Sequence, residues 1–278
     1  MTSIAGLLAE ARKELQDSDS PALDAELLLC HVLGKPRSFL FTWPEQEVGE
    51  LLAAQFHQLL VRRVSGEPVA HLLGRREFYG HEFLVSADTL IPRPDTELLV
   101  DVVLEKLPAE QPLRIADLGT GTGAIAISLA LARPAWQLLA VDYIVAVLDL
   151  VERNVRRLRA ANVMPIQSSW YSRLQGPFDA IVSNPPYIPQ REAHLMPDQV
   201  LRFEPEQALF VSDDQPLVFY EKIARLGLMK LSGDGRAYVE TNEYNAEEVV
   251  EIFRRAGYRE VTLEQDMQGK DRMVRSSR

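Results

Sequence analysis

The sequence predicts an α/β protein in which a doubly wound, mostly parallel sheet follows a small helical domain. Two observations carry this prediction. Helical periodicity fills roughly the first 65 residues, and from about residue 113 onward short apolar runs alternate with helical patterns. Such alternation is typical of parallel sheets with helices on both faces. The 278 residues suffice for one large domain or for a main domain with an appendage.

Residues 1–66 are expected to form the helical domain. Apolar side chains recur there at spacings of three and four residues, which indicates helices with one buried face. The pair Ser20-Pro21 is typical of a helix start and Gly34 of a helix end, and a further helix is expected over residues 47–64. No cluster of catalytic residue types occurs here, so this domain is expected to serve recognition rather than chemistry.

Residues 67–90 are expected to form a β-hairpin that links the helical domain to the rest of the chain. The segment Gly66-Glu67-Pro68 ends the helical pattern, and residues 69–73 and 78–85 are rich in apolar and aromatic side chains. Glycines punctuate these two runs, as expected for a short strand pair. The main domain is then expected over residues 91–278.

The main domain reads as alternating strands and helices. Strands are expected over residues 113–118, 138–141, 163–167, 178–182 and 237–240, and helices over residues 124–132, 148–158 and 246–256. Two closing strands, around Val261 and Met273, are expected to form an antiparallel edge. A doubly wound sheet with one antiparallel edge follows from this order.

The charge, cysteine content and hydrophobicity of the sequence exclude several classes of function. The net charge of −10 argues against a general nucleic-acid binder, because such proteins neutralise phosphates. The single Cys30 fits a reducing compartment, and no secretory signal or apolar run of about 20 residues occurs. The five histidines show no metal-ligand spacing. We therefore expect a cytoplasmic protein that binds neither a membrane nor a metal and does not bind nucleic acid directly. We also expect a monomer.

A glycine-rich turn lies where the strand over residues 113–118 meets the following helix. Glycines in such a turn allow close approach of the backbone to a ligand, although a tight structural turn is the simpler alternative. An acid that ends the next strand typically binds ribose hydroxyls. The spacing Gly-x-Gly-x-Gly favours S-adenosylmethionine over a dinucleotide, with S-adenosylhomocysteine as its product. The predicted cofactor residues of this motif are Gly119, Thr120, Gly121, Thr122, Gly123 and Asp142.

A second motif, Asn184, Pro185, Pro186 and Tyr187, follows the strand that ends at residue 182. Two prolines stop the strand, because neither can donate a backbone N–H and both restrict φ. An amide NH2 group needs two acceptors to be held, and Asn184 supplies one of them. We interpret this loop as a clamp for a planar NH2 group, while a proline-rich surface turn is the alternative.

Both motifs are expected to face one crevice, because open α/β sheets bind ligands beyond the carboxyl ends of their strands. Trp170 follows another strand of the same sheet, so it is expected near the adenine of the cofactor. A core or rim tryptophan is the alternative for that residue. Asn184 is expected to touch both the cofactor and the methyl acceptor.

Together these residues resemble the amino-methyltransferases with an Asn-Pro-Pro-Tyr motif, and within them the PrmC/HemK family of peptide chain release factor glutamine methyltransferases. The resemblance covers essentially the whole chain. It implies a Rossmann-like class I methyltransferase domain and N5-methylation of the glutamine in the Gly-Gly-Gln loop of class I release factors. The supporting segments are Gly66 to Gly74, Phe78-Tyr79-Gly80, Leu90 to Glu97, Arg202-Phe203-Glu204-Pro205 and Ala208-Leu209.

The clamp suits that reaction chemically. A glutamine amide nitrogen is a poor nucleophile, so placement in line with the sulfonium methyl is expected to supply most of the acceleration. The side-chain oxygen of Asn184 and the backbone carbonyl of Pro185 can accept the two amide protons. Pro186 and Tyr187 are expected to wall the slot and exclude water.

Three segments depart from the pattern of the family. Tyr143-Ile144-Val145 follows Asp142, where the family has a polar or small residue and then Ser or a similar group. Ser168-Ser169 precedes Trp170 in place of an acid, and Glu240-Thr241-Asn242-Glu243 replaces a Glu-His-Gly or Glu-Ile-Gly segment. Two of these departures lie beside the expected cofactor site and are expected to affect affinity rather than fold.

Two alternative functions stay open on sequence alone. An adenine N6-methyltransferase acting on nucleic acid can use the same clamp, although it must extract its base and hold phosphates. A cofactor-impaired binding protein of the same fold is the other alternative. Cofactor binding and the identity of the methyl acceptor discriminate between them.

Overall fold

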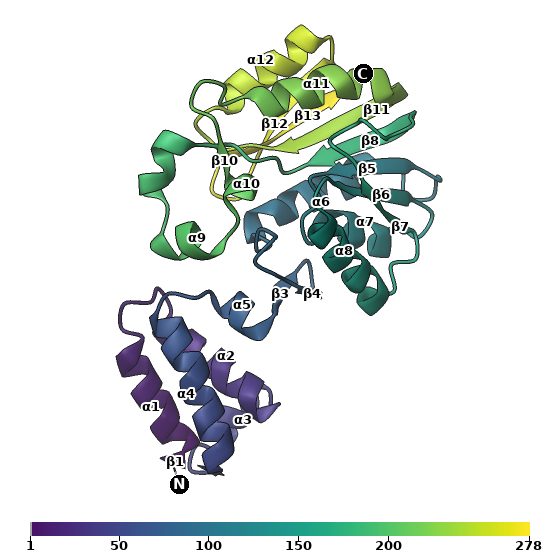
Figure 1. The fold of residues 1–278 in the computed structure, drawn as a ribbon. Helices are drawn as coiled ribbons and strands as arrows, with labels where there is room; N and C mark the ends of the chain where they lie inside the picture. The colour runs from purple at the N-terminus through teal and green to yellow at the C-terminus, as the bar shows by residue number, and fades with distance from the viewer. Residues whose placement is uncertain (1) are drawn as a thin grey trace. The chain divides into compact units, whose positions relative to one another are not determined.

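The computed structural model describes residues 2–278, which fold into two compact units (Figure 1). The first unit holds the described residues up to Arg75 together with Pro197–Phe203. The second holds Arg76–Met196 and Glu204–Arg278. The segment Pro197–Phe203 thus interrupts the second unit in sequence but packs with the first.

The first unit is helical and has its own core. Its helices enclose a cluster of buried side chains that includes Ile4, Leu28 and Phe56. The elements are β1 (Thr2–Ser3), α1 (Ile4–Glu14), α2 (Pro21–Leu33), α3 (Arg37–Thr42), β2 (Glu47–Val48), α4 (Glu50–Val64), α5 (Val69–Leu73) and α9 (Asp198–Phe203). Pro21 begins α2 and Gly34 ends it with φ 61°, as the sequence predicts.

Two sequence-based predictions for this region are wrong in detail. Residues 69–73 form the helix α5 and not a strand, because Pro68 precedes it, Gly74 ends it, and Val69, Leu72 and Leu73 pack at helical spacing on the core. The helix expected from residue 47 begins at Glu50, since Glu47–Val48 pairs with Thr2–Ser3. Strand pairing thus overrides the helical periodicity at Glu47–Val48.

The expected hairpin is present but shifted. It consists of β3 (Arg75–Phe78) and β4 (His81–Leu84), which pair in a two-stranded sheet. The turn between them is Tyr79-Gly80, with φ values of 50° and 72°. A two-residue turn with both φ values positive suits the twist of a hairpin.

The second unit contains, among the described residues, a seven-stranded sheet in the order β12-β13-β11-β8-β5-β6-β7. Its neighbours from β11 to β7 are parallel, and β13 pairs antiparallel with β11 and β12, so the predicted antiparallel edge is confirmed. The strands are β5 (Arg114–Leu118), β6 (Gln137–Asp142), β7 (Val163–Gln167), β8 (Phe178–Ser183), β11 (Leu231–Glu240), β12 (Arg259–Gln265) and β13 (Asp271–Ser277).

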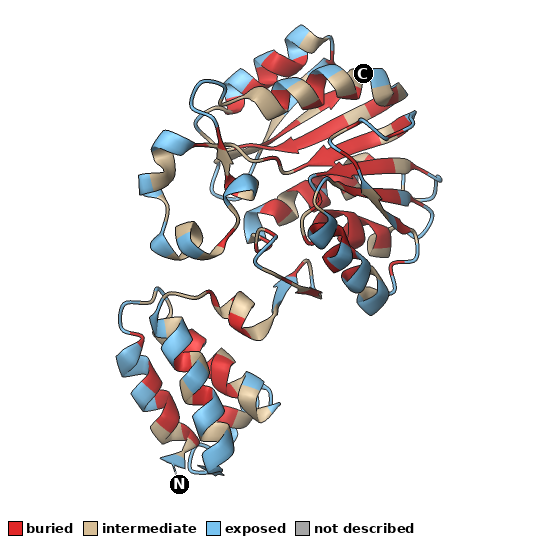
Figure 2. Ribbon diagram, viewed as in Figure 1, coloured by how far each residue is buried: buried red, intermediate tan, exposed pale blue. Residues whose placement is uncertain are grey.

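Helices cover both faces of this sheet (Figure 1). One face carries α6 (Glu97–Lys106), α7 (Ala124–Ala132) and α8 (Val145–Leu158), and the other carries α11 (Val218–Lys230) and α12 (Ala246–Ala256). Successive strand residues alternate between the two cores, with Ile115 in the first and Ala116 in the second. Figure 2 shows the sheet buried between these layers, which confirms the doubly wound prediction.

This unit also contains several short elements. They are the 3-10 helices η1 (Pro94–Thr96) and η2 (Gln190–Leu195), the helix α10 (Glu206–Leu209), and the parallel pair β9 (Ile188–Pro189) and β10 (Phe210–Val211). None of the helices in residues 2–278 combines the length and hydrophobicity needed to cross a bilayer.

The register of the sheet places the carboxyl ends of four strands side by side, and we call this side of the sheet its carboxyl edge. Leu118 at the end of β5 pairs with Val141 of β6 and with Ser183 of β8. Ser183 in turn pairs with Val239 of β11. Because β6 and β8 flank β5 after crossovers in opposite directions, this edge is the switch point where such sheets bind ligands.

Candidate functional site

A cavity of about 470 Å³ lies at the carboxyl edge of the sheet, within the second unit. Most of the residues that the sequence singles out line it. They are Gly119, Thr120, Gly121, Thr122, Asp142, Trp170, Asn184, Pro185 and Pro186. Gly123 and Tyr187 do not line it.

The glycine-rich turn is attached to the neighbouring strand. The backbone N–H groups of Gly119 and Thr120 both donate to the carbonyl of Val141, at 2.9 and 3.0 Å. Gly121 has φ 54°, and a Cβ built on it would meet no atom within 4 Å. Its backbone is therefore exposed to the cavity in a conformation that favours glycine.

Gly123 has a packing role instead. It precedes α7 with φ 80°, and a Cβ there would lie 3.0 Å from Ile127 Cδ1 and 3.2 Å from Val151 Cγ1. The absence of a side chain thus allows α7 and α8 to pack closely. Of the three motif glycines, this one acts on the fold rather than on the cavity wall.

Asp117, near the end of β5, stabilises the glycine-rich turn through hydrogen bonds. Its Oδ2 accepts from Thr120 Oγ1 at 2.6 Å and from the backbone N–H of Ala126 at 3.3 Å. Its Oδ1 has no hydrogen-bond partner among residues 2–278, and the residue is fully buried. Burial raises the pKa of Asp117 to about 7, although the hydrogen bonds from Thr120 and Ala126 oppose this shift.

Asp142 ends β6 and lines the cavity. Its Oδ1 accepts from the backbone N–H groups of Tyr143 at 2.8 Å and of Ile144 at 3.2 Å. Burial raises the pKa of this carboxyl, while hydrogen bonds from the backbone of Ile144, Gly121 and Tyr143 oppose the shift. The carboxylate is thereby fixed at the edge of the cavity.

Trp170 forms an aromatic wall with Phe219 of α11. The two rings stack with centroids 5.0 Å apart and an interplanar angle of 30°, and both line the cavity. Lys222 Nζ lies 5.4 Å from the Trp170 ring centroid, as in a cation–π contact. Trp170 adopts φ 54°, so its loop follows a constrained path.

The two segments that depart from the family pattern beside the cavity both contribute to its lining. The hydroxyl of Ser168 donates to the Trp170 carbonyl at 2.9 Å and accepts from the Arg173 N–H at 3.1 Å, so it stabilises the loop. Tyr143 lines the cavity and is 57% exposed, which places it at the rim. Val145 is equally exposed but does not line the cavity.

The Asn-Pro-Pro loop leaves β8 at the centre of the edge. Ser183, the last residue of β8, donates its hydroxyl to the Leu118 carbonyl at 2.7 Å and so fixes the start of the loop. Asn184 Nδ2 then donates to Thr96 Oγ1 at 3.2 Å. Because the NH2 end of the amide is bound there, its oxygen is the end that remains for a ligand.

Tyr187 lies on the other side of the loop. It packs against the core beneath α11 and α12 instead of lining the cavity. Burial, together with the negative charge of Glu240, raises the pKa of its phenol well above the ordinary value. Tyr187 supports the loop from behind in this arrangement.

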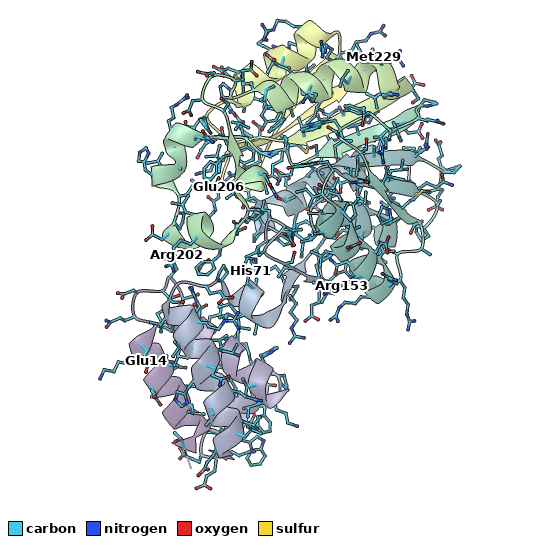
Figure 3. The ribbon with its side chains drawn as sticks, in the orientation of Figure 1. Glu14, His71, Arg153, Arg202, Glu206 and Met229 are labelled. Atoms are coloured by element: carbon cyan, nitrogen blue, oxygen red, sulfur yellow. The ribbon has the colours of Figure 1, made fainter. Side chains whose placement is uncertain are left out.

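Sequence reasoning assigned no role to several residues that the structure places at or near the cavity. Arg93 lines the cavity and forms a 2.6 Å ion pair with Glu204, whose other oxygen accepts from the Ile91 N–H at 3.0 Å. Thr96 also lines the cavity. Gln207 and Ala208 contribute from α10, which begins at Glu206 (Figure 3). Only the resemblance of the surrounding segments could have pointed to these positions.

Comparison with known proteins places the chain among curated relatives over nearly its full length. The release factor glutamine methyltransferases of Salmonella typhimurium and Escherichia coli are each 43% identical over 96% of this chain and 96% of their own. A solved release-factor-specific protein-(glutamine-N5) methyltransferase from Alicyclobacillus acidocaldarius is 32% identical. That match covers 68% of this chain and 94% of the other, with a TM-score of 0.42.

Two domain families match the chain, the PrmC N-terminal domain over residues 6–74 and the methyltransferase small domain over residues 95–210. With the doubly wound sheet and its cavity, they define a class I methyltransferase that carries an additional N-terminal domain. Because curated relatives match it at 43% identity over 96% of its length, the chain belongs to the release factor glutamine methyltransferase family.

Proposed function

We propose that this protein transfers a methyl group from S-adenosylmethionine to the side-chain amide nitrogen of the glutamine in the Gly-Gly-Gln loop of class I release factors. One observation carries the proposal: the glycine-rich turn and the Asn-Pro-Pro loop line the same cavity. A cofactor site and an amide clamp are thus within reach of each other. The curated relatives are release factor glutamine methyltransferases, which supports a glutamine of a release factor as the substrate.

The residues of the cavity fit S-adenosylmethionine. Asp142 presents a fixed carboxylate for ribose hydroxyls, and the open backbone at Gly121 suits the amino-acid tail. Trp170 and Tyr143 offer apolar surface for the adenine. Asp142 lines the cavity, and a ligand with positive charge would stabilise the ionised form of this buried carboxyl. When bound, the cofactor supplies a methyl group on a sulfonium, which is a good leaving group.

The clamp residues orient the acceptor nitrogen. Asn184 Oδ1 and the Pro185 carbonyl accept the two protons of the glutamine NH2, which aims the nitrogen lone pair at the cofactor methyl. Transfer would form a carbon–nitrogen bond as the carbon–sulfur bond of the bound cofactor breaks, with S-adenosylhomocysteine as the product. The nitrogen then releases its excess proton to water. Pro186 lines the slot, and Tyr187 supports the loop behind it.

The two units divide the work in this proposal. Residues 1–66 form a recognition domain for the release factor, residues 67–90 form a linker with a hairpin, and residues 91–278 carry the methyltransferase site. Every residue that lines the cavity belongs to the second unit, which supports the separation of the site from the helical domain; Phe78, Asp88, Thr89 and Leu90 of the linker segment also line the cavity. We also propose that the protein acts as a cytoplasmic monomer.

Methyl transfer from labelled cofactor to a purified class I release factor tests the proposal. We expect label in the wild-type release factor and none in a variant whose Gly-Gly-Gln glutamine is replaced by glutamate. An adenine-containing oligonucleotide serves as the competing acceptor. Label in the oligonucleotide alone would favour the adenine N6-methyltransferase, and no cofactor binding at millimolar concentration would favour the impaired binding protein.

A further inference from the structure

A buried carboxyl group lies behind the clamp. Glu240 is the last residue of β11 and is 6% exposed. It does not line the cavity, and its Oε2 has no hydrogen-bond partner among residues 2–278. A buried carboxylate with an unsatisfied oxygen is costly, so its presence beside a reactive site calls for a function.

Glu240 lies beside two residues that line the cavity. The side chains of Thr96 and Asn184 lower the pKa of the Glu240 carboxyl, and the pairing of Val239 with Ser183 places Glu240 next to Asn184. Asn184 Nδ2 also lies 3.2 Å from Thr96 Oγ1. Thr96 is 5% exposed, so both Thr96 and Glu240 are shielded from solvent.

The hydrogen bond from Asn184 to Thr96 and the neighbouring carboxylate of Glu240 together favour one orientation of the Asn184 amide. A threonine hydroxyl has one proton, so Thr96 accepts from Asn184 when it donates to Glu240. The NH2 group of Asn184 therefore points to Thr96 and Glu240, and Oδ1 points away from them. A flipped amide would place Oδ1 against the carboxylate and would offer NH2 to a substrate NH2, so that two donors face each other.

We propose that Glu240 is a positioning residue that acts through Thr96 and Asn184 and holds the Asn184 amide with its oxygen toward the methyl-accepting group. This proposal rests on the proposed function for its effect on turnover. It assigns Glu240 no contact with either substrate. Its action requires the ionised carboxylate, because a protonated carboxyl can donate to Asn184 Oδ1 and so stabilise the flipped amide.

The surroundings of Glu240 place the pKa of its carboxyl within the pH range in which enzyme activity can be measured. Burial raises the pKa of Glu240 to about 7, and the charge of Asp95 raises it further, whereas Thr96, Arg272 and Asn184 lower it. Arg272 is shared with Asp95 and Asp266, at 3.2 and 2.9 Å. The phenols of Tyr187 and Tyr220 also face Glu240, and their pKa values lie well above the ordinary range, so they stay neutral.

The test measures kcat at saturating cofactor and release factor against pH. For the wild-type protein we expect kcat to fall about tenfold per pH unit below about pH 7. Glu240→Gln should lower kcat at least tenfold at pH 8 and remove this pH dependence, with the cofactor dissociation constant changed less than about twofold. Thr96→Val should lower kcat similarly, and Thr96→Ser, which keeps the hydroxyl, should restore it.

Two kinetic outcomes would overturn the proposal. One is a Glu240→Gln variant with the wild-type kcat and pH profile. The other, which decides if Glu240→Gln fails to fold, is a Thr96→Val variant as active as Thr96→Ser.

A second readout does not depend on activity. The side-chain amide resonances of Asn184, assigned by their loss in Asn184→Ala, should titrate near pH 7 in the wild-type protein and not in Glu240→Gln. If the wild-type protein methylated no release factor, the proposed function would fall. The resonances would still decide the orientation of Asn184, and a lack of titration in the wild-type protein would contradict the role of Glu240.

Discussion

At the scale of single residues, Asn184 carries the proposed chemistry. Asn184→Ala removes one of the two acceptors of the clamp but leaves the glycine-rich turn and Asp142 in place. We expect methyl transfer to fall by roughly a hundredfold or more, as for the loss of one preorganised polar group in a reaction site. Calorimetry should show nearly unchanged affinity for S-adenosylmethionine. Equal loss of both properties would show that Asn184 serves the cofactor site and not the clamp.

Asp117 predicts a pH dependence of stability. Its pKa is raised from 3.8 to about 7 in the folded protein, so between these values the unfolded chain ionises while the folded protein keeps the proton. Stability therefore falls as pH rises from about 4 to 7, by on the order of 4 kcal/mol from this group. Denaturant unfolding of ligand-free Asp117→Asn should show a correspondingly smaller fall. The same fall in variant and wild type would contradict the raised pKa of the buried Asp117 carboxyl.

At the scale of elements, substitutions of two glycines in the same turn are expected to affect different properties, cofactor binding for Gly121 and stability for Gly123. Gly121→Ala places a methyl group in open space toward the cavity, so it should weaken cofactor binding, with about 1 kcal/mol of destabilisation from φ 54°. Gly123→Ala meets Ile127 and Val151 as well as a φ of 80°, so it should cost about 2–3 kcal/mol of stability.

Thermal unfolding and cofactor titration of both glycine variants check this separation, and each variant is the control for the other. We expect Gly123→Ala to lose more stability than Gly121→Ala. For a given loss of stability, Gly121→Ala should lose more affinity for the cofactor. Similar behaviour of the two variants would mean that the turn acts as one structural unit.

The same scale shows what the sequence could predict. The helix Ala124–Ala132 and the strand Val163–Gln167 have the predicted bounds, because each is set by its own apolar pattern. The helix Val69–Leu73 was missed, since five residues carry too little periodicity and its core contacts come from distant elements. The site is similar: the two loops could be predicted from their motifs, whereas Glu240 enters only through the pairing of β11 with β8.

At the scale of the whole molecule, the two units have separate cores, and Arg63 is central to the first. Its Nε forms a 2.7 Å ion pair with Asp24, and its guanidinium also donates to Ser18 and to Gln199 of the segment Pro197–Phe203. Both side chains of the pair are at most 11% exposed. Arg63→Ala leaves the buried Asp24 carboxylate without its ion-pair partner, with only the hydroxyls of Ser18 and Ser20 as donors within the described chain, and should cost about 3 kcal/mol.

Hydrogen exchange measures this effect by segment. Protection should fall in α1, α2 and α4 of Arg63→Ala and stay unchanged in the seven-stranded sheet, while cofactor affinity is kept. Arg62→Ala is the matched control, since Arg62 is 53% exposed and its pair with Glu67 is worth at most about 1 kcal/mol. Equal loss of protection in the sheet would contradict the independence of the two cores.

The most direct measurement for the whole account is peptide mass analysis of a class I release factor after incubation with this protein and S-adenosylmethionine. The account predicts the mass of one methyl group on the peptide that contains Gly-Gly-Gln, located on the glutamine side chain, with the wild-type protein and not with Asn184→Ala. A methyl group at another residue, or an unmodified release factor despite bound cofactor, would contradict it.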